Sequence, residues 1–201
     1  IITKVESPYP GTAPVAFILG PKFFITLHEI APTSFKNFAS RIAKPFAVPQ
    51  PVSPAHLMEG LVEEMITRVA YNSQIVVDTL DSLSHSIFDA EVLNTKGIST
   101  SQLMKTVLKR LGAAADLTSK INESLHSINR LLHFFKKARA NDAALDSKID
   151  ILVMDTVALT TQTAFLSDKI TLQLDATLGM INVEQNLIIK IFSVVSVFLM
   201  P

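Results

Sequence analysis

The longest helical pattern in this chain lies at its C-terminal end, and it constrains the fold more than any other feature. From Ala143 to Met200 the only helix-weakening residue is Gly179. The pattern predicts one helix of about 57 residues, which at 1.5 Å per residue spans about 85 Å. A helix of this length is not stable alone, so it must pack against neighbouring helices or copies of itself.

The last part of this helix is apolar. Residues Leu187 to Met200 are apolar or small apart from Lys190. A helix needs about 20 residues to cross a bilayer, and this run has 14. We therefore expect a first transmembrane helix of which the chain contains only a part, preceded by the water-soluble part of a larger protein. Lys190 can extend its ammonium group to the lipid headgroups and would mark the cytoplasmic side.

Residues 1–54 contain almost all of the prolines and predict a small α/β region. Two apolar runs, 15–19 and 23–27, flank Gly20 and Pro21 and predict a hairpin of two strands. Thr33 or Ser34 can cap a short helix over 35–43. The chain starts without methionine, so we expect 1–54 to be the C-terminal part of an N-terminal α/β domain.

Residues 55–140 predict a long helical hairpin. Apolar residues recur at helical spacing over 56–93 and again from about 100 to 139, and the segment Asn94 to Gly97 stops the first helix. A short turn at 140–142 leads into the long helix of 143–201. The predicted fold is α+β with an αβα arrangement, dominated by helices. It has a partial α/β domain, an antiparallel helical pair and a very long C-terminal stalk helix.

Composition excludes several kinds of function. The 201 residues carry 18 basic and 18 acidic side chains, and this balance does not favour nucleic acid as a partner. The absence of cysteine excludes disulfides, thiolate metal sites and a cysteine nucleophile. The sequence has neither a phosphate-binding glycine loop nor a spacing typical of a serine–histidine–aspartate triad, so we expect no enzymatic activity.

Other candidate sites have simple structural interpretations. None of the five histidines pairs with another at the spacing of a helical metal site. His56, Glu59 and Glu63 could bind a cation weakly, but a capped, solvated helix start is the simpler interpretation. Lys136 and Lys137 could contact phosphate, yet their place near a helix C-terminus also explains them.

A polar stripe follows one face of the long helix. Steps of three and four residues place these mostly polar or small residues together: Asp168, Asp175, Gly179, Asn182, Asn186, Ile189, Ser193, Ser196 and Met200. Polar groups on a membrane helix should not face lipid. The stripe is either a packing seam between helices or one wall of a pore built from several copies, whose carboxylate and amide rings would attract a cation.

These residues resemble the CorA family of divalent-cation transporters. The segment Gly179 to Pro201 resembles the end of the family's stalk helix and the start of its first membrane helix, and Ile128 to Arg139 resembles the segment before the stalk. Residues 13–39 are similar to the family's strand pair, which is followed by Pro-x-x-Phe-x-x-Phe, here Pro32 to Phe38. The resemblance covers most of the chain.

The resemblance implies a homopentameric channel in the inner, cytoplasmic membrane, with this part of the chain in the cytoplasm. It implies Mg2+ as ligand and transported ion, with Co2+, Zn2+ or Ni2+ as alternatives. An ungapped alignment places six residues on the pore: Asp175, Asn186, Ile189, Phe192, Ser196 and Met200. Ile189 and Phe192 fall at its hydrophobic constriction. Family members are gated by divalent cations bound between protomers, and the candidate stalk ligands are Asp146, Asp150 and Asp155.

Two departures from the family keep other functions open. The Gly-Met-Asn selectivity signature is absent from the chain, and we expect it beyond Pro201. The helical hairpin is also less acidic than is usual in the family. One alternative is a zinc-transporting ZntB-like relative. Another is a membrane-anchored structural protein without transport activity, in which the stripe is only a packing seam.

Overall fold

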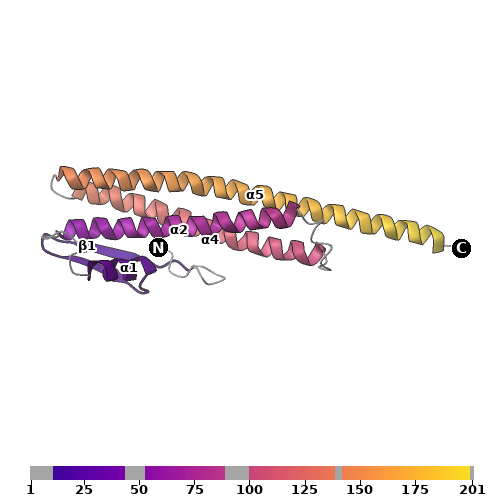
Figure 1. Ribbon diagram of the computed structural model, residues 1–201, viewed down its shortest axis with the longest axis horizontal. Helices are drawn as coiled ribbons and strands as arrows, with labels where there is room; N and C mark the ends of the chain where they lie inside the picture. Colours follow the sequence, from indigo (N-terminus) through magenta and orange to yellow (C-terminus); the bar gives the residue numbers. More distant parts are fainter. Residues whose placement is uncertain (1–10, 44–52, 89–99, 139–141, 200–201) are drawn as a thin grey trace. The chain divides into compact units, whose positions relative to one another are not determined.

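The computed structural model describes residues 11–43, 53–88, 100–138 and 142–199, which form one two-stranded sheet and four helices (Figure 1). These residues belong to two compact units. The first unit is Ile1–Val76 with Asp116–Leu166, and the second is Val77–Ala115 with Ser167–Pro201. Each unit takes one segment from each of three long helices: α2 (Pro54–Phe88), α4 (Thr100–Ala138) and α5 (Ala143–Leu199). The predicted helix-dominated α+β fold is confirmed.

The sheet in the first unit is a hairpin. Strand β1 (Val15–Leu19) pairs antiparallel with β2 (Phe24–His28), so that Phe17 lies opposite Thr26. The second strand starts one residue later than predicted, because the backbone oxygen of Phe23 accepts a hydrogen bond from Gly20 at 2.9 Å and belongs to the turn. A Cβ at Gly20 would lie 2.5 Å from the Phe23 ring, so glycine allows this turn to close.

Helix α1 (Thr33–Ile42) covers one face of the hairpin. Its buried Phe35 stacks against Phe17, with ring centroids 6.2 Å apart. The prediction that Thr33 or Ser34 caps this helix was wrong: both lie inside it, and Pro32 is the N-cap, without a side-chain cap bond. Its backbone oxygen accepts the first hydrogen bond, from the Phe35 N–H at 3.0 Å. The opposite sheet face is exposed and apolar, formed by Ala16, Ile18, Ile25 and Leu27.

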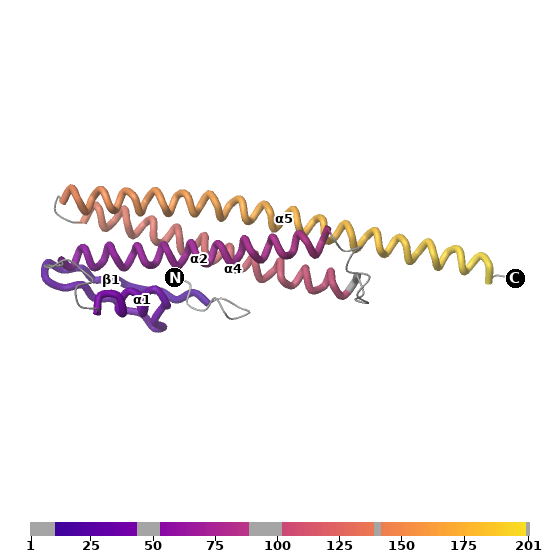
Figure 2. Tube along the Cα trace, in the orientation of Figure 1, coloured from indigo at the N-terminus to yellow at the C-terminus, as the bar shows by residue number. Residues whose placement is uncertain are grey.

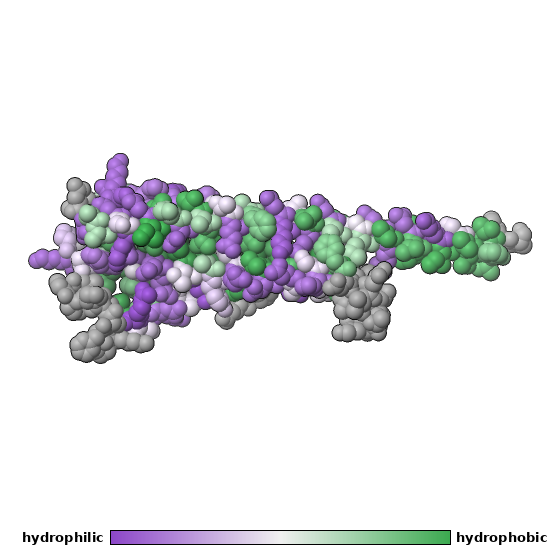
Figure 3. Space-filling view, turned by 45° about the horizontal axis from the view of Figure 1, so that its top comes forward, coloured by the Kyte–Doolittle hydropathy of each residue, from purple (hydrophilic) through white to green (hydrophobic). Residues whose placement is uncertain are grey.

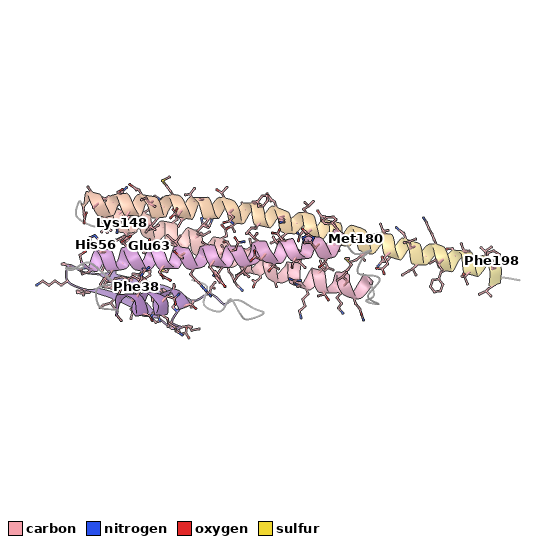
Figure 4. All side chains as sticks on the ribbon, in the orientation of Figure 1. Phe38, His56, Glu63, Lys148, Met180 and Phe198 are labelled. Atoms are coloured by element: carbon pink, nitrogen blue, oxygen red, sulfur yellow. The ribbon has the colours of Figure 1, made fainter. Side chains whose placement is uncertain are left out.

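Close approach at a glycine joins α1 to α2. A Cβ at Gly60 would lie 3.1 Å from the Phe38 ring, so a larger residue would press on the helix pair. Arg41 forms an ion pair with Glu64 at 3.4 Å, and Asn37 donates to the same carboxylate at 3.3 Å. Figure 4 labels Phe38 on α1 beneath the first turns of α2. These contacts attach the sheet and α1 to the long helices.

Capping residues define where two long helices begin. The Ser53 hydroxyl accepts a hydrogen bond from the His56 N–H at 3.3 Å, and Pro54 occupies the first helical position of α2. The Asp142 carboxylate accepts a hydrogen bond from the Leu145 N–H at 3.2 Å at the start of α5. The predicted turn before the long helix therefore ends at its cap.

The first unit has a continuous apolar core among its three helix segments. The helices bury residues at steps of three and four, including Leu61, Val62, Met65, Val69, Ile121, Leu125, Ile128, Leu132, Leu145 and Ile149. Polar contacts cross between the same helices. Asn129 donates to the Thr156 hydroxyl at 3.0 Å, and Lys148 lies 3.6 Å from the buried carboxylate of Glu59. These contacts set the register of α5 against α2 and α4.

The second unit buries fewer residues. Its core includes Leu80, Leu83, Ile87, Met104, Val107, Leu111 and Ile170. Beyond these contacts α5 continues past the ends of α2 and α4, as the yellow part of the tube in Figure 2 shows. All described residues from 185 to 199 are exposed. The C-terminal segment of α5 therefore has no partner helix in the described chain.

Candidate functional site: one face of the longest helix

The polar stripe and the packed face of α5 lie on opposite sides of the helix. In the second unit the packed face buries Ile170, Gln173 and Thr177. Asp175 and Gly179, which belong to the stripe, are exposed on the other side. A Cβ built on Gly179 would meet no atom within 4 Å. At these two positions the stripe is therefore not used for packing within the described part of the chain.

The stripe continues into the apolar C-terminal segment. Asn182 and Asn186 are exposed, and so are the predicted pore residues Ile189, Phe192 and Ser196. Met200, the sixth predicted pore residue, lies outside the described residues. Figure 4 labels Met180, which is half-buried, and Phe198, which is 84% exposed, and these mark the packed and unpacked parts of α5.

The two serines of the stripe satisfy their hydroxyl hydrogens within the helix. The Ser193 hydroxyl donates to the backbone oxygen of Ile189 at 2.8 Å, and Ser196 donates to that of Phe192 at the same distance. This bond from residue i to residue i−4 lets a serine stay in an apolar helix without an unsatisfied donor. The hydroxyl oxygen keeps lone pairs that can accept a hydrogen bond or contact a cation.

The C-terminal part of α5 has the composition of a membrane span. By length and composition α5 is able to cross a membrane: an 18-residue window has a mean hydropathy of 1.4, and none of it is buried. In Figure 3 this end of α5 is covered mostly by apolar side chains. Exposed residues such as Ile188, Ile191 and Val195 lie beside the stripe. A large exposed apolar surface of this kind marks a site that binds lipid or another protein.

Large apolar side chains are also exposed nearer the start of α5. Ile151, Met154 and Phe165 are 56%, 70% and 65% exposed. They follow one another at helical spacing and lie away from the buried Leu152, Thr156 and Thr163. The exposed side of α5 therefore carries large apolar side chains well before its C-terminal segment.

The three candidate regulatory carboxylates are not gathered into one site. The Asp150 carboxylate forms an ion pair with Lys136 of α4. Asp146 is half-buried in the first turn of α5 and also has a polar partner. Asp155 is exposed next to Met154 on the outer face. Among the described residues, no group of three acidic or histidine side chains is arranged to share a metal ion.

The histidine–glutamate set on α2 is used for structure. The His56 ring forms a hydrogen bond with the Ser53 hydroxyl at 2.7 Å, and the buried Glu59 pairs with Lys148. Glu63 is exposed, and Figure 4 labels it beside His56. The capped helix start is therefore confirmed, whereas the buried Glu59 is not solvated as predicted.

Sequence reasoning missed a groove in the first unit. It has a volume of about 890 Å3 and lies between the chain entering β1 and one face of α4. Phe17 from β1, Met65 from α2 and Arg130 and Phe134 from α4 line it. No sequence motif marks this groove, because it depends on the tertiary position of 12–17 beside α4.

Comparison with known proteins places the chain in a family. The sequence model of the family described as "CorA-like Mg2+ transporter protein" matches residues 2–201. The chain belongs to this CorA-like family. It is 29% identical to a magnesium transport protein CorA of Haemophilus ducreyi over 98% of this chain and 59% of that protein. It is also 29% identical to the CorA of Escherichia coli K12 over 96% of this chain and 58% of that protein.

A solved structure supports the fold. The CorA magnesium transporter of Methanocaldococcus jannaschii matches with a TM-score of 0.68 at 17% identity, covering 88% of this chain and 53% of that one. The chain thus spans somewhat more than half the length of the CorA proteins that it matches. The predicted relationship to the CorA family is confirmed. Membership in this family of ion transporters also agrees with the expectation that the protein is not an enzyme.

Proposed function

We propose that this chain is the cytoplasmic stalk and the start of the first membrane helix of a homo-oligomeric Mg2+ transporter. In this proposal the polar stripe of α5 lines the path of the ion. The observation that carries the proposal is the exposure of the stripe on the side of α5 opposite its packed face, continuing into an apolar segment without a partner helix.

The free-energy cost of exposing polar side chains to lipid favours an assembly with the stripe at its centre. Asn186 directly precedes the apolar segment and Asn182 lies one turn before it. An amide turned toward hydrocarbon without a hydrogen-bond partner costs several kcal/mol. The same amides lose nothing when they face water inside a pore. The apolar side chains beside the stripe can then contact lipid or the neighbouring helices. Placing the stripe at the axis of several copies satisfies both kinds of surface.

The chemistry of the stripe suits a hydrated divalent cation. Copies of α5 around an axis would form a ring of carboxylates at Asp175 and rings of amides at Asn182 and Asn186. Carboxylate rings attract cations. Mg2+ gives up its water ligands reluctantly, so amide oxygens can bind its hydration shell rather than the bare ion. Ile189 and Phe192 would follow as an apolar constriction that can close by expelling water.

A homopentamer in the cytoplasmic membrane is the assembly that we propose. The exposed apolar residues Ile151, Met154 and Phe165 give copies of α5 a surface to bury. Asp155 lies beside this surface and has no ion pair with any described residue. It is therefore our choice among the three candidate carboxylates for control by divalent cations, and a site there would need ligands from a second copy.

A second candidate function is structural. Small and polar residues also suit a packing seam between membrane helices, and in that case the chain would anchor a helical assembly without transport. A ZntB-like zinc transporter is a third possibility, with the same stripe and a different cargo. The ion is a separate question from the position of the stripe, and competition by other divalent cations during uptake would distinguish Mg2+ from Zn2+.

Cysteine cross-linking tests the position of the stripe, because the chain has no cysteine of its own. We expect Asn182→Cys in membrane vesicles to give disulfide-linked dimers under mild oxidation, since equivalent positions meet near an axis. The matched control is Glu184→Cys, which lies about 200° round the helix and should give few. Equal cross-linking at both positions would argue against a stripe at the axis.

A further inference from the structure

Two lysines near the start of α4 have no acidic partner in the described part of the chain. Lys105 and Lys109 are exposed and one helical turn apart, so they share a face. Two other basic residues of α4 are held by the protein: Arg110 donates to the Ser82 hydroxyl at 2.8 Å, and Lys120 pairs with Asp116 at 2.7 Å. The pair formed by Lys105 and Lys109, here called the α4 lysine pair, is therefore available to another partner.

Contacts within the second unit give the height of the α4 lysine pair along α5. Arg110 is level with Ser82 of α2. Gln173 of α5 contacts Leu80 and Ser84 on either side of Ser82, so Arg110 is also level with about residue 172 of α5. Because α4 runs antiparallel to α5, Lys105 is level with about residue 177, roughly 15 Å before Leu187 at 1.5 Å per residue.

This height brings the lysine pair close to a membrane surface. The inference rests on the proposed function, in which the hydrocarbon layer begins near Leu187. The headgroup layer is about 6 Å thick on each side of the bilayer, and a lysine side chain extends about 6 Å from its helix. The headgroup layer then ends about 9 Å from the level of Lys105, so the side chain brings its ammonium group to within about 3 Å of the headgroups. Lys109 lies about 6 Å lower, so its ammonium group is about 9 Å from the headgroups, close to the screening length of about 8 Å at physiological salt.

The acidic groups that the structure describes near this height do not cancel the charge of the lysine pair. Asp81 of α2 pairs with Lys169 of α5 at 2.6 Å, and Asp78 also has a polar partner. Asp175 lies at the same height on the side of α5 away from α2 and α4, and Glu184 is half-buried. Among the described residues, the ammonium groups of Lys105 and Lys109 are the charges nearest the membrane surface on this face of α4.

We propose that the α4 lysine pair binds anionic lipid headgroups and holds the start of α4 at the membrane surface. Anionic lipids attract a basic side chain near the surface by about fivefold in binding constant per charge. The partner is a membrane surface with phosphatidylglycerol-like headgroups. Through this contact the lipid composition would control the position of α4 beside the stalk helix.

Single-cysteine fluorescent labels test the proposal in the full chain in lipid vesicles. A label at Gln102→Cys lies on the face of the lysine pair, three residues before Lys105. A control label at Ala113→Cys is exposed and about 16 Å further from the membrane end of the helix. A third label at Ser193→Cys reports insertion. Vesicles contain phosphatidylcholine alone or mixed with phosphatidylglycerol, and quenchers are attached to headgroups or to acyl chains.

We expect the acyl-chain quencher to reach residue 193 in both lipids. The headgroup quencher should quench the label at residue 102 several-fold more in anionic than in neutral vesicles. It should quench the label at residue 113 only weakly in either kind of vesicle. Lys105→Glu with Lys109→Glu should abolish the lipid difference at residue 102, whereas Lys22→Glu with Lys137→Glu should keep it. Equal quenching at residue 102 in both lipids, with residue 193 inserted, overturns the proposal alone. Failure of residue 193 to insert overturns the proposed function as well.

Discussion

The side-chain amide of Gln173 in α5 donates a hydrogen bond to the backbone oxygen of Leu80 in α2, at 2.9 Å. The same nitrogen donates to the Ser84 hydroxyl at 2.7 Å, while the amide oxygen of Gln173 is buried without a partner. Gln173 lies on the packed face of α5, opposite the polar stripe. This contact therefore fixes which face of α5 stays exposed.

Gln173→Glu should destabilise the second unit strongly. The substitution places a carboxylate against the backbone oxygen of Leu80, and a buried charge without a partner costs about 3 kcal/mol or more. Gln173→Met has a similar volume and removes the unpartnered oxygen together with the two hydrogen bonds, so we expect a change within about 1.5 kcal/mol. Urea unfolding in detergent micelles, followed by circular dichroism, measures both, and equal losses would contradict this account.

Asn72→Leu should stabilise the first unit. Asn72 is 1% exposed, and neither its amide nitrogen nor its amide oxygen has a hydrogen-bond partner. Leucine has a similar size and no polar group to desolvate, so we expect the free energy of unfolding to rise by about 1 kcal/mol or more. The matched control is Asn129→Leu, which removes a hydrogen bond to Thr156. It should lower the free energy of unfolding by about 1 kcal/mol. If the urea midpoints of Asn72→Leu and Asn129→Leu shifted in the same direction, this explanation would be contradicted.

Gly179→Ala separates helix stability from assembly. A Cβ at Gly179 meets nothing within 4 Å, and the same is true of Gly112 on α4. Both substitutions should therefore stabilise an isolated chain by about 0.5–1 kcal/mol, because alanine is the better helix former. Only Gly179 lies on the stripe, so only Gly179→Ala should slow Mg2+ uptake by the complete transporter. A similar effect of both variants on uptake would remove Gly179 from the proposed path.

Much of this fold follows from local patterns. Apolar residues at steps of three and four predicted the three long helices, and the turn around Gly20 predicted the hairpin, because both patterns act over a few residues. The exposed face of α5 was also predicted, since Asp175, Gly179 and Asn186 interrupt the apolar pattern at regular spacing. The spacing of these three residues is enough to identify the stripe.

Other features depend on contacts between distant residues. Gln173 and Asn72 are polar, and nothing in their local sequence marks them as core positions. The Pro32 cap was missed because a backbone oxygen, rather than the nearby hydroxyls, accepts the first hydrogen bond of α1. Asp150 was one of three candidate stalk ligands implied by the family resemblance, and its ion pair with Lys136 of a different helix was not predicted. A search for motifs cannot find a partner fourteen residues away across a turn.

The central claim is that the stripe of α5 lines the ion path, and Asp175 tests it most directly. The measurement is Mg2+ uptake into vesicles containing the complete transporter, reported by an enclosed indicator, with Asp116→Ala on α4 as the control for loss of an exposed carboxylate. We predict that Asp175→Ala slows uptake about tenfold or more, because a ring of one charge sign raises the local cation concentration by at least that factor. Uptake by Asp175→Ala equal to that of the unmodified protein would contradict the account.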